Sequence, residues 1–562
     1  MRRLTPASAL KRLEQLKLVY GPDSEIGKRD LLEPLRDAEL DTVSQVVRLH
    51  ETLCFLRAYP DGPELLKRVE EMLEGFDRRP DLLWFRDELD SSGISGTTIS
   101  YSFFWFTAVW LARRWPELFH VEWELFENQV LLSARLMALM PYSETLALEE
   151  VWLEAPDWVE RLKSATETDA TFLTRRFGAL PFDDFWKEQV FEELDLPCRL
   201  DPGPTTPSRS RARYEPSPVV FQTGPLETSR GCFPGALRRP PRAVRRAAPR
   251  DADRLISLAR EAMVCRARDL DVFIHAERRD VHIMDCGRGL QYVCYGAIPE
   301  RRQMLDAVYG FLILKNGVPI GYFLTSALYR SALVAFNVFE TYRGAEAAYV
   351  YGRGLAMVRH MFGADSFGIE TYQLGHNNKE ALASGAWWFY YKLGFRPRDP
   401  ETLAIVSDEV RKIRENPSHR SSIATLARLA EVEMYLHLGR ERDDIVGLIS
   451  REAIGFRLSR FLAERFGADR ERGVRVCAGE AARRLGVRSR SRFSAGERLA
   501  WNRWAPLVLI LPRVERWSES SRADLVEVIR SKGSARESEF VARFDRHRTL
   551  RRAILELAQE TG

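Results

Sequence analysis

The sequence predicts an α/β protein with a mixed sheet domain in the middle of the chain, flanked by two mostly α-helical regions. Apolar residues recur at three- and four-residue spacing through residues 1–200 and again after residue 400, which indicates amphipathic helices. Between these regions, β-rich runs follow one another closely and then alternate with helical patterns. We therefore divide the chain into a helical region at 1–200, a linker at 201–241, a sheet domain at 242–400 and a helical region at 401–562.

Composition indicates a globular protein of several domains. The chain has 562 residues, of which 45% are hydrophobic and 29% charged, and such a length favours about two to four domains. Its 84 basic and 80 acidic residues give a net charge of +4, which favours neither nucleic acid nor an anionic membrane as the main partner. The 7 cysteines are scattered without a CxxC pair, so we expect a reducing cytoplasm and no metal site.

The N-terminal region carries no motif that identifies an activity. Its predicted helices are Val46–Leu56, Pro63–Phe76, Phe103–Leu111, Trp123–Met140 and Asp183–Leu194. Ser91–Ala112 lacks charges, but its apolar part, Ile99–Ala112, covers about fourteen residues against the roughly twenty that a membrane-spanning helix needs. We expect a buried helix there, no membrane association, and no signal peptide, because charges recur every few residues at the N-terminus.

The linker and the C-terminal region add no strong functional signal. Residues 201–241 are rich in Pro, Gly, Ser and Arg, which indicates a linker or an extended strap. Gly479–Arg492 is similar to the first helix and turn of a helix-turn-helix, but Phe493–Trp504 lacks the pattern of a recognition helix. Nucleic acid is therefore not a favoured partner. The alternative role for the C-terminal helices is packing or contact between copies of the chain in an oligomer. The predicted C-terminal helical segments are Pro400–Arg414, Ser421–Leu438, Asp443–Phe466 and Ser521–Leu557.

The middle domain begins with a short strand and an amphipathic helix, and a less regular piece follows. Three strand-like runs come next, at Tyr309–Lys315, Val318–Leu328 and Ala332–Phe339. Asn316-Gly317, between the first two runs, is among the strongest short hairpin signals. We expect an antiparallel meander here.

After the meander, the segment NVFETYRGAEAA (337–348) predicts an anion site. An apolar strand ends there in a loop of small residues, and the loop opens a predicted helix at Glu346–Phe362. Unpaired backbone N–H groups and the positive end of the helix dipole would face a bound anion. A strand at Phe367–Tyr372 and a helix at about Asn378–Leu393 complete the unit.

Three segments of this domain share the pattern of a known enzyme family. They are VRRAAPRDADRLISLA at its start, YRGAEAA after the meander and AWWFYYKLGFRP at its end. With them, the chain from about Arg242 to Pro397 resembles the GNAT superfamily of acyl-CoA-dependent N-acyltransferases. The resemblance implies acetyl-CoA or another acyl-CoA as co-substrate and an amine as acceptor. It also implies that the coenzyme pyrophosphate lies on a loop formed by Arg343, Gly344, Ala345, Ala347 and Ala348.

The loop departs from the family pattern in two places. Glu346 stands where the family usually has Gly, and its carboxylate would repel a pyrophosphate unless it points away. Ala383 replaces the family's Asn, so Asn378 is our substitute candidate for coenzyme binding. A second register of the loop, Tyr351–Ala356, would leave only about nine helical residues before the next strand, too few to cross back along the sheet.

Acyl transfer to an amine needs a base for the amine, polarisation of the thioester carbonyl and an acid for the leaving thiolate. By resemblance, Tyr390 is the acid, and backbone N–H groups near Val338 and Phe339 bind the pantetheine arm and the developing oxyanion. Glu340 and Glu370 are the two candidates for the base. The competing hypothesis is a catalytically inactive fold of this type that serves as a binding or scaffold module.

Overall fold

The computed structural model describes residues 5–21 and 23–559. It divides into two compact units. Unit 1 contains the chain up to Pro225 together with Arg254–Ile274 and Lys315–Pro319, and unit 2 contains Leu226–Asp253, His275–Leu314 and the chain from Ile320 onward. The predicted α/β class, with helical regions on both sides of a mixed sheet, is confirmed.

Unit 1 is mainly helical. Its elements are α1 (Pro6–Leu16), α2 (Ser24–Arg36), α3 (Val43–Ala58), α4 (Pro63–Glu74), α5 (Pro80–Trp84), β1 (Ile99–Tyr101), α6 (Trp105–Arg114), β2 (Phe119–Val121), α7 (Gln129–Leu139), α8 (Thr145–Glu150), α9 (Ala155–Leu162), α10 (Asp169–Gly178), α11 (Asp184–Glu192), β3 (Cys198–Leu200) and α14 (Asp271–Ile274). The long α13 (Pro249–Val264) begins in unit 2 and continues in unit 1. A small antiparallel sheet, in the order β1-β3-β2, adds strands that the helical periodicity did not predict.

The uncharged stretch from Ser91 to Ala112 is a loop, a strand and a helix. It includes β1 and most of α6, and the side chains of Trp105, Ala108 and Leu111 are buried in the core of unit 1. In the described part of the chain, no helix combines the length and the apolar character that crossing a membrane requires.

The first half of the predicted linker is an ordered strap on unit 1. Arg57 and Asn316 hold it: the Arg57 guanidinium donates to the carbonyl of Arg209 (3.0 Å), and the Asn316 side chain bonds both the N–H and the carbonyl of Val220. Tyr214 donates its N–H to Gly317 (2.9 Å). The Asn-Gly turn therefore serves as an attachment point as well as a hairpin turn.

Unit 2 is built around the large sheet. Its elements are α12 (Phe233–Arg238), β4 (Ala243–Arg246), β5 (Ala276–Asp285), β6 (Leu290–Ala297), β7 (Ala307–Lys315), β8 (Val318–Leu328), β9 (Ser331–Val338), α15 (Ala347–Phe362), β10 (Ser366–Ile369), α16 (Thr371–Leu374), α17 (Lys379–Ser384), α18 (Ala386–Lys392), α19 (Pro400–Glu415), α20 (Ile423–Leu429), β11 (Met434–His437), α21 (Arg451–Phe466), α22 (Arg470–Leu485), α23 (Ala495–Ile510), α24 (Glu519–Lys532), α25 (Ser538–Arg546) and α26 (Arg548–Gln559).

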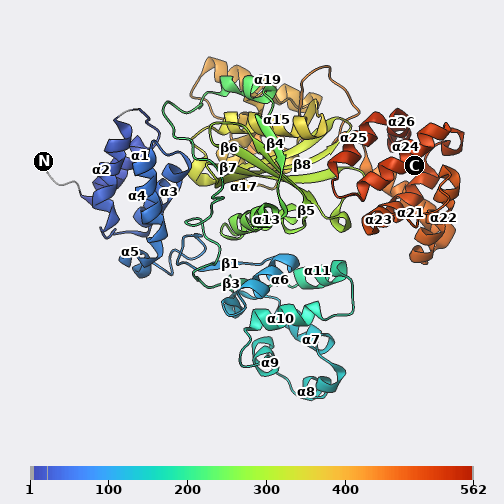
Figure 1. The fold of residues 1–562 in the computed structure, drawn as a ribbon, viewed down its shortest axis with the longest axis horizontal. Helices are drawn as coiled ribbons and strands as arrows, with labels where there is room; N and C mark the ends of the chain where they lie inside the picture. The colour runs from blue at the N-terminus through green and yellow to red at the C-terminus, as the bar shows by residue number, and fades with distance from the viewer. Residues whose placement is uncertain (1–4, 22, 560–562) are drawn as a thin grey trace. The chain divides into compact units, whose positions relative to one another are not determined.

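The sheet runs in the order β11-β10-β9-β8-β7-β6-β5-β4, so its strands follow the chain order from one edge to the other. Figure 1 labels its strands β4 to β8. The β7–β8 hairpin is confirmed: Asn316 and Gly317 have φ of 50° and 79°, as a type I′ turn requires. β9 and β10 are parallel, whereas β10 and β11 are antiparallel. The sheet is therefore mixed.

Several predicted boundaries in unit 2 were wrong. The less regular piece contains two full strands, β5 and β6. β6 is buried throughout and β5 is buried from Asp280 to Met284, so these stretches do not alternate in polarity. The predicted helix at Ser421–Leu438 ends at Leu429, and its last residues form β11 because an edge of the sheet is there to pair with. Gly385, at φ 66°, divides the predicted helix at Asn378–Leu393 into α17 and α18.

Buried charges join the C-terminal helices to the sheet within unit 2. The Lys532 ammonium contacts Glu537 at 2.5 Å and donates to the carbonyl of Asp306 at 2.8 Å, while the Arg302 guanidinium donates to the carbonyl of Lys532 at 2.6 Å. All three charged side chains are at most 4% exposed. Removing one partner of such a buried pair leaves an uncompensated charge, so loss of any of these side chains would be strongly destabilising.

Helix α15 lies close against the sheet because two of its residues are glycines. A Cβ on Gly354 would lie 2.8 Å from the ring of Phe323 on β8, and a Cβ on Gly352 would lie 2.9 Å from Ala236 on α12. These glycines belong to the rejected second register of the loop, and the helix that contains them begins one residue after the predicted start. Their role is packing.

We predict that Gly354→Val destabilises the protein by about 1–3 kcal/mol, because the added methyl groups would overpack the interface with Phe323. The matched control is Gly455→Val in α21, where a Cβ meets no atom within 4 Å, and its effect should stay within about 0.5 kcal/mol. Urea unfolding followed by circular dichroism measures both. Equal unfolding midpoints for the two variants would contradict the close packing.

Candidate functional site

The N-terminal end of α15 forms one wall of an open cavity of about 520 Å³. Of the residues that the sequence predicted for a coenzyme loop, five line it: Arg343, Gly344, Ala345, Ala347 and Ala348. The opposite wall is the segment Thr228–Gly231, and Phe389 of α18 closes one side. The structure therefore brings the predicted loop together around a space large enough for a small ligand.

The loop is shaped by its own backbone. After β9, a short 3₁₀ turn at Glu340–Tyr342 reverses the chain, and Ala345 donates its N–H to the carbonyl of Tyr342 (3.1 Å). The first intrahelical bond of α15 runs from Val350 to the carbonyl of Glu346 (2.8 Å). Hence the N–H groups of the preceding first-turn residues have no intrahelical acceptor, and the positive end of the helix dipole lies at the cavity.

Glu346 points away from the cavity. Its side chain is 3% exposed and does not line the space, and its Oε1 accepts a hydrogen bond from the backbone N–H of Glu227 (3.3 Å). The residue that departs from the family pattern thus holds the segment that forms the opposite wall. The repulsion expected between its carboxylate and a bound phosphate is reduced by this geometry.

The opposite wall is also anchored from behind by Arg353 of α15. This guanidinium is fully buried and donates to the carbonyls of Ala236 (3.0 Å) and Pro240 (3.0 Å), on either side of the C-terminal end of α12. Phe233 of α12 stacks on Tyr351 with ring centroids 6.0 Å apart. α12 and the segment before it are therefore fixed to the helix whose N-terminus faces the cavity.

The surroundings of the cavity are cationic. Arg230 and Arg343 line it, and no acidic residue is among the described residues that do. Arg343 also donates from Nε to the carbonyl of Val338 (3.1 Å) and pairs with Glu380. Burial lowers the pKa of Lys392, and the positive charges of Arg230 and Arg420 lower it further. Cations that repel one another in this way favour an anionic ligand.

Next to this loop, β9 extends beyond the end of β10. The two strands pair from Ser331 with Ser366 to Leu333 with Gly368, but β9 continues to Val338 while β10 ends at Ile369. Both predicted backbone sites, Val338 and Phe339, lie at this far end of β9, and Phe339 donates its N–H to Ile320 of β8 (2.9 Å). The side chain of Gln373 accepts from the N–H of Phe336 (3.3 Å), where a paired strand would otherwise lie.

A second carboxylate lies beside Glu370, which was one of the two predicted bases. Glu370 is exposed immediately after β10, and Glu433 immediately precedes the partner strand β11. Burial raises the pKa of Glu433, and the negative charge of Glu370 raises it further, against the opposing effects of the Tyr435 hydroxyl and Arg451. Tyr435 donates its hydroxyl to Glu433. Two carboxylates of different environment are thus neighbours at the end of the β9–β10 pair.

Tyr390, the predicted acid, and Asn378, a predicted coenzyme-binding residue, are not among the residues that line the cavity. Tyr390 is buried among Tyr351, Phe389 and Phe395, it does not line the cavity, and burial raises its pKa strongly. Asn378 caps α17, accepting from the N–H of Ala381 (3.0 Å). Their assigned roles stay predictions.

Glu340 is exposed at the start of the 3₁₀ turn, where its carbonyl accepts from the N–H of Arg343 (3.2 Å). Its role as a base also stays a prediction.

Compared with protein-family models, curated proteins and solved structures, the chain matches none of them. The geometry of the site therefore carries the functional argument. Among the residues that the structure describes, no group of His, Cys, Asp and Glu is arranged to hold a metal ion.

Sequence reasoning missed Arg230, Lys392 and Glu433. Arg230 lies in the segment interpreted as a linker, and Glu433 lies in a predicted helix that turns out to end before it. Only the pairing of β11 with β10 brings Glu433 to the site. The sequence signal that could have indicated Arg230 is its position between Ser229 and Gly231 in a Pro-rich segment. That composition is equally typical of an ordinary loop.

We predict that the pKa of Glu433 in the folded protein lies above 4.5, falls in Glu370→Gln and rises in Arg451→Gln. Carbon-13 NMR titration of the Glu carboxyls measures the pKa, with Glu433→Gln to assign the signal and Glu380→Gln as the control without effect. Because the folded state holds this proton more tightly, the free energy of unfolding should fall as the pH rises from the unfolded pKa through the folded one. An unchanged pKa in Glu370→Gln would show that the two carboxylates do not interact.

Proposed function

We propose that the chain is an N-acyltransferase that transfers an acetyl or other acyl group from acyl-CoA to an amine in the cytoplasm. The observation that carries this proposal is the cavity at the N-terminus of α15, where five predicted loop residues meet Arg230 and the one carboxylate of the loop points away. Helix N–H groups, two guanidiniums and a concave wall suit a pyrophosphate. The described cysteines, all 7 of them free, are compatible with a reducing compartment.

The extension of β9 beyond the end of β10 supports the acyl-CoA assignment further. A pantetheine arm that leaves the pyrophosphate at Arg343 would reach the end of β9 at Val338, because the Arg343 side chain already contacts that carbonyl. From there the parallel pair leads to Glu370 and Glu433, at the end of β10. The proposed path thus runs from the cavity along the end of β9 to the two carboxylates, which follow β10 and precede β11.

The chemistry assigns a role to each group. The amine loses a proton to a carboxylate, directly or through water, and attacks the thioester carbonyl; the C–S bond then breaks and the thiolate takes a proton. Glu433 is the better base of the two carboxylates, since a raised pKa brings it closer to the operating pH than that of an ordinary glutamate. Tyr390 remains the proposed acid, and its burial keeps the phenol protonated for that step.

One observation favours the competing hypothesis of a catalytically inactive binding module. The Gln373 side chain bonds the Phe336 N–H, so that part of the β9 edge is satisfied by the protein itself. An acyl-CoA arm that used this edge would have to displace Gln373. Coenzyme binding and turnover separate the two hypotheses.

We predict that acetyl-CoA binds and that Arg343→Gln and Arg230→Gln each weaken binding about 10- to 100-fold, because each removes a charged hydrogen-bond donor from the cavity. Isothermal titration calorimetry with acetyl-CoA and desulfo-CoA measures this affinity. Arg428→Gln, a change of the same charge at an exposed position of α20, is the matched control. Failure to detect binding at millimolar coenzyme would eliminate the acyltransferase proposal.

We further predict that Glu433→Gln lowers kcat about 10²- to 10⁴-fold with little change in coenzyme affinity, because it removes the base and leaves the cavity intact. Tyr390→Phe should act in the same direction. Free-thiol release from acetyl-CoA in the presence of amine pools measures turnover and identifies the acceptor. If acetyl-CoA binds but the unmodified protein releases no more thiol than Glu433→Gln with any amine pool, the hypothesis of a catalytically inactive binding module is supported instead.

A further inference from the structure

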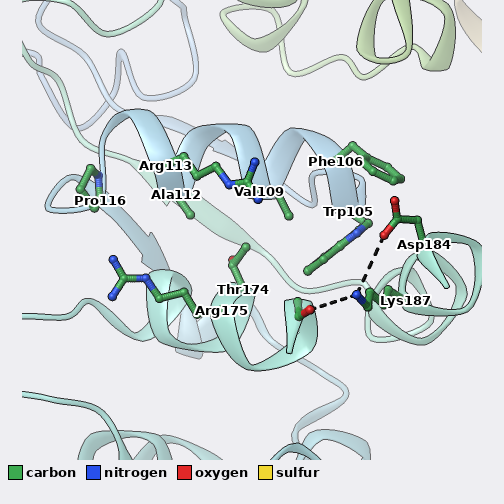
Figure 2. A pocket seen from close by; sticks show the side chains of 11 residues that line it. Trp105, Phe106, Val109, Ala112, Arg113, Pro116, Thr174, Arg175, Asp184 and Lys187 are labelled. Atoms are coloured by element: carbon green, nitrogen blue, oxygen red, sulfur yellow. Dashed lines mark hydrogen bonds and ion pairs between the residues drawn. The ribbon is translucent and has the colours of Figure 1, made fainter. Parts of the chain in front are cut away.

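Unit 1 contains its own ligand-sized cavity, separate from the site described above. It has a volume of about 590 Å³ and lies between α6, α10 and α11 (Figure 2). This volume is in the range of about 300–1,000 Å³ that is typical of small-molecule sites. Its lining consists of Trp105, Phe106, Val109, Ala112, Arg113, Pro116, Thr174, Arg175, Gly178, Asp184 and Lys187.

One face of α6 supplies the apolar wall. Trp105, Val109 and Ala112 follow one another at helical spacing, so they present one continuous surface to α10 and α11. The Trp105 ring is fixed from behind by Phe191 and Phe177, with centroids 5.2 and 6.4 Å away. Figure 2 shows this indole extending into the space beneath α6. Trp105 is only 3% exposed, so only an edge of its ring reaches the cavity, and the partly exposed Phe106 and Val109 contribute the rest of the apolar wall. Such a wall favours an apolar or aromatic body.

The rim of the cavity carries three cations, and two of them have partners. Arg175 pairs with Glu167 at 2.6 Å, and Lys187 donates to the carbonyl of Gly178 at 3.0 Å. Arg113 lies on α6 above the apolar wall, and among the residues that the structure describes its side chain has no ion-pair partner. Its neighbour Arg114, which does not line the cavity, contacts Glu261 at 3.6 Å.

The charged side chains that line the cavity favour a ligand with a single negative charge. Asp184 lines the same cavity, with its carboxylate 4.0 Å from Lys187. A polyanion such as pyrophosphate would be repelled by the Asp184 carboxylate. A ligand with one carboxylate can instead pair with Arg113, away from Asp184. We propose that the cavity binds a small monoanionic amphiphile, namely a carboxylate with an aromatic or aliphatic body, whose charge pairs with Arg113 and whose body lies against the apolar wall around Val109.

The experiment uses the full-length protein and 1-naphthoate as the probe, with binding measured by isothermal titration calorimetry. Naphthoate should bind with a stoichiometry of one, and Arg113→Gln should weaken it about tenfold or more. Val109→Trp, which fills the cavity from α6, should weaken it by a similar factor. The neutral analogue 1-naphthalenemethanol should bind at least tenfold more weakly, and inorganic pyrophosphate should not compete.

Arg114→Gln is the matched control, because it makes the same change one residue away on the same helix and outside the cavity. Its affinity for naphthoate should be unchanged. The proposal is overturned if Arg113→Gln and Arg114→Gln weaken binding equally, if Val109→Trp leaves binding intact, or if the neutral analogue binds as well as the acid. Circular dichroism of each variant checks that a loss of binding is not a loss of fold.

Discussion

The close approach of α15 to its neighbours is the constraint on which the geometry of unit 2 depends. Gly352 allows α12 to pack against one side of the helix, and Gly354 allows the ring of Phe323 to pack against another. The fully buried Arg353, between these two glycines, binds the carbonyls at the end of α12. One short stretch of helix therefore sets the position of the sheet below, of the segment beside it and of the cavity at its own N-terminus.

The same constraint explains why Glu346 is compatible with an anion site. Because α12 is fixed to α15, the preceding segment lies within hydrogen-bond distance of the helix start, and the Glu346 carboxylate accepts the N–H of Glu227 there. A side chain that would oppose phosphate if it faced the cavity instead helps to build the opposite wall. The cationic residues that remain at the cavity, Arg230 and Arg343, come from both sides of this contact.

The cavity at α15 and the cavity at α6 differ in their electrostatics, and this difference decides what each would bind. At the α15 cavity, helix N–H groups and two arginines are present without a lining carboxylate, which suits a polyanion. At the α6 cavity, Asp184 offsets part of the positive charge and the walls are apolar. Volume alone, about 520 and 590 Å³, would not distinguish them.

The sequence by itself determined the elements whose conformation depends on residues close to one another in the chain. The Asn316-Gly317 hairpin follows from residues that tolerate positive φ, and α15 was placed to within one residue because its apolar periodicity and small-residue entry are local signals. The α/β class followed from the same patterns. The five residues that the family resemblance assigned to a coenzyme loop lie around one helix start and line one cavity, and their binding role stays a prediction.

What only the tertiary structure decided depends on partners distant in the sequence. β6 and the second half of β5 are buried on both faces, so their sequence does not alternate. The last residues of the predicted helix at Ser421–Leu438 became β11 because β10 offered an unpaired edge. That pairing places Glu433 beside Glu370, and the packing of α12 on α15 turns Arg230 toward the anion loop and Glu346 away from it. Local sequence specifies which conformations a segment prefers, but the energy of strand pairing and burial selects among them only when the distant partner is present.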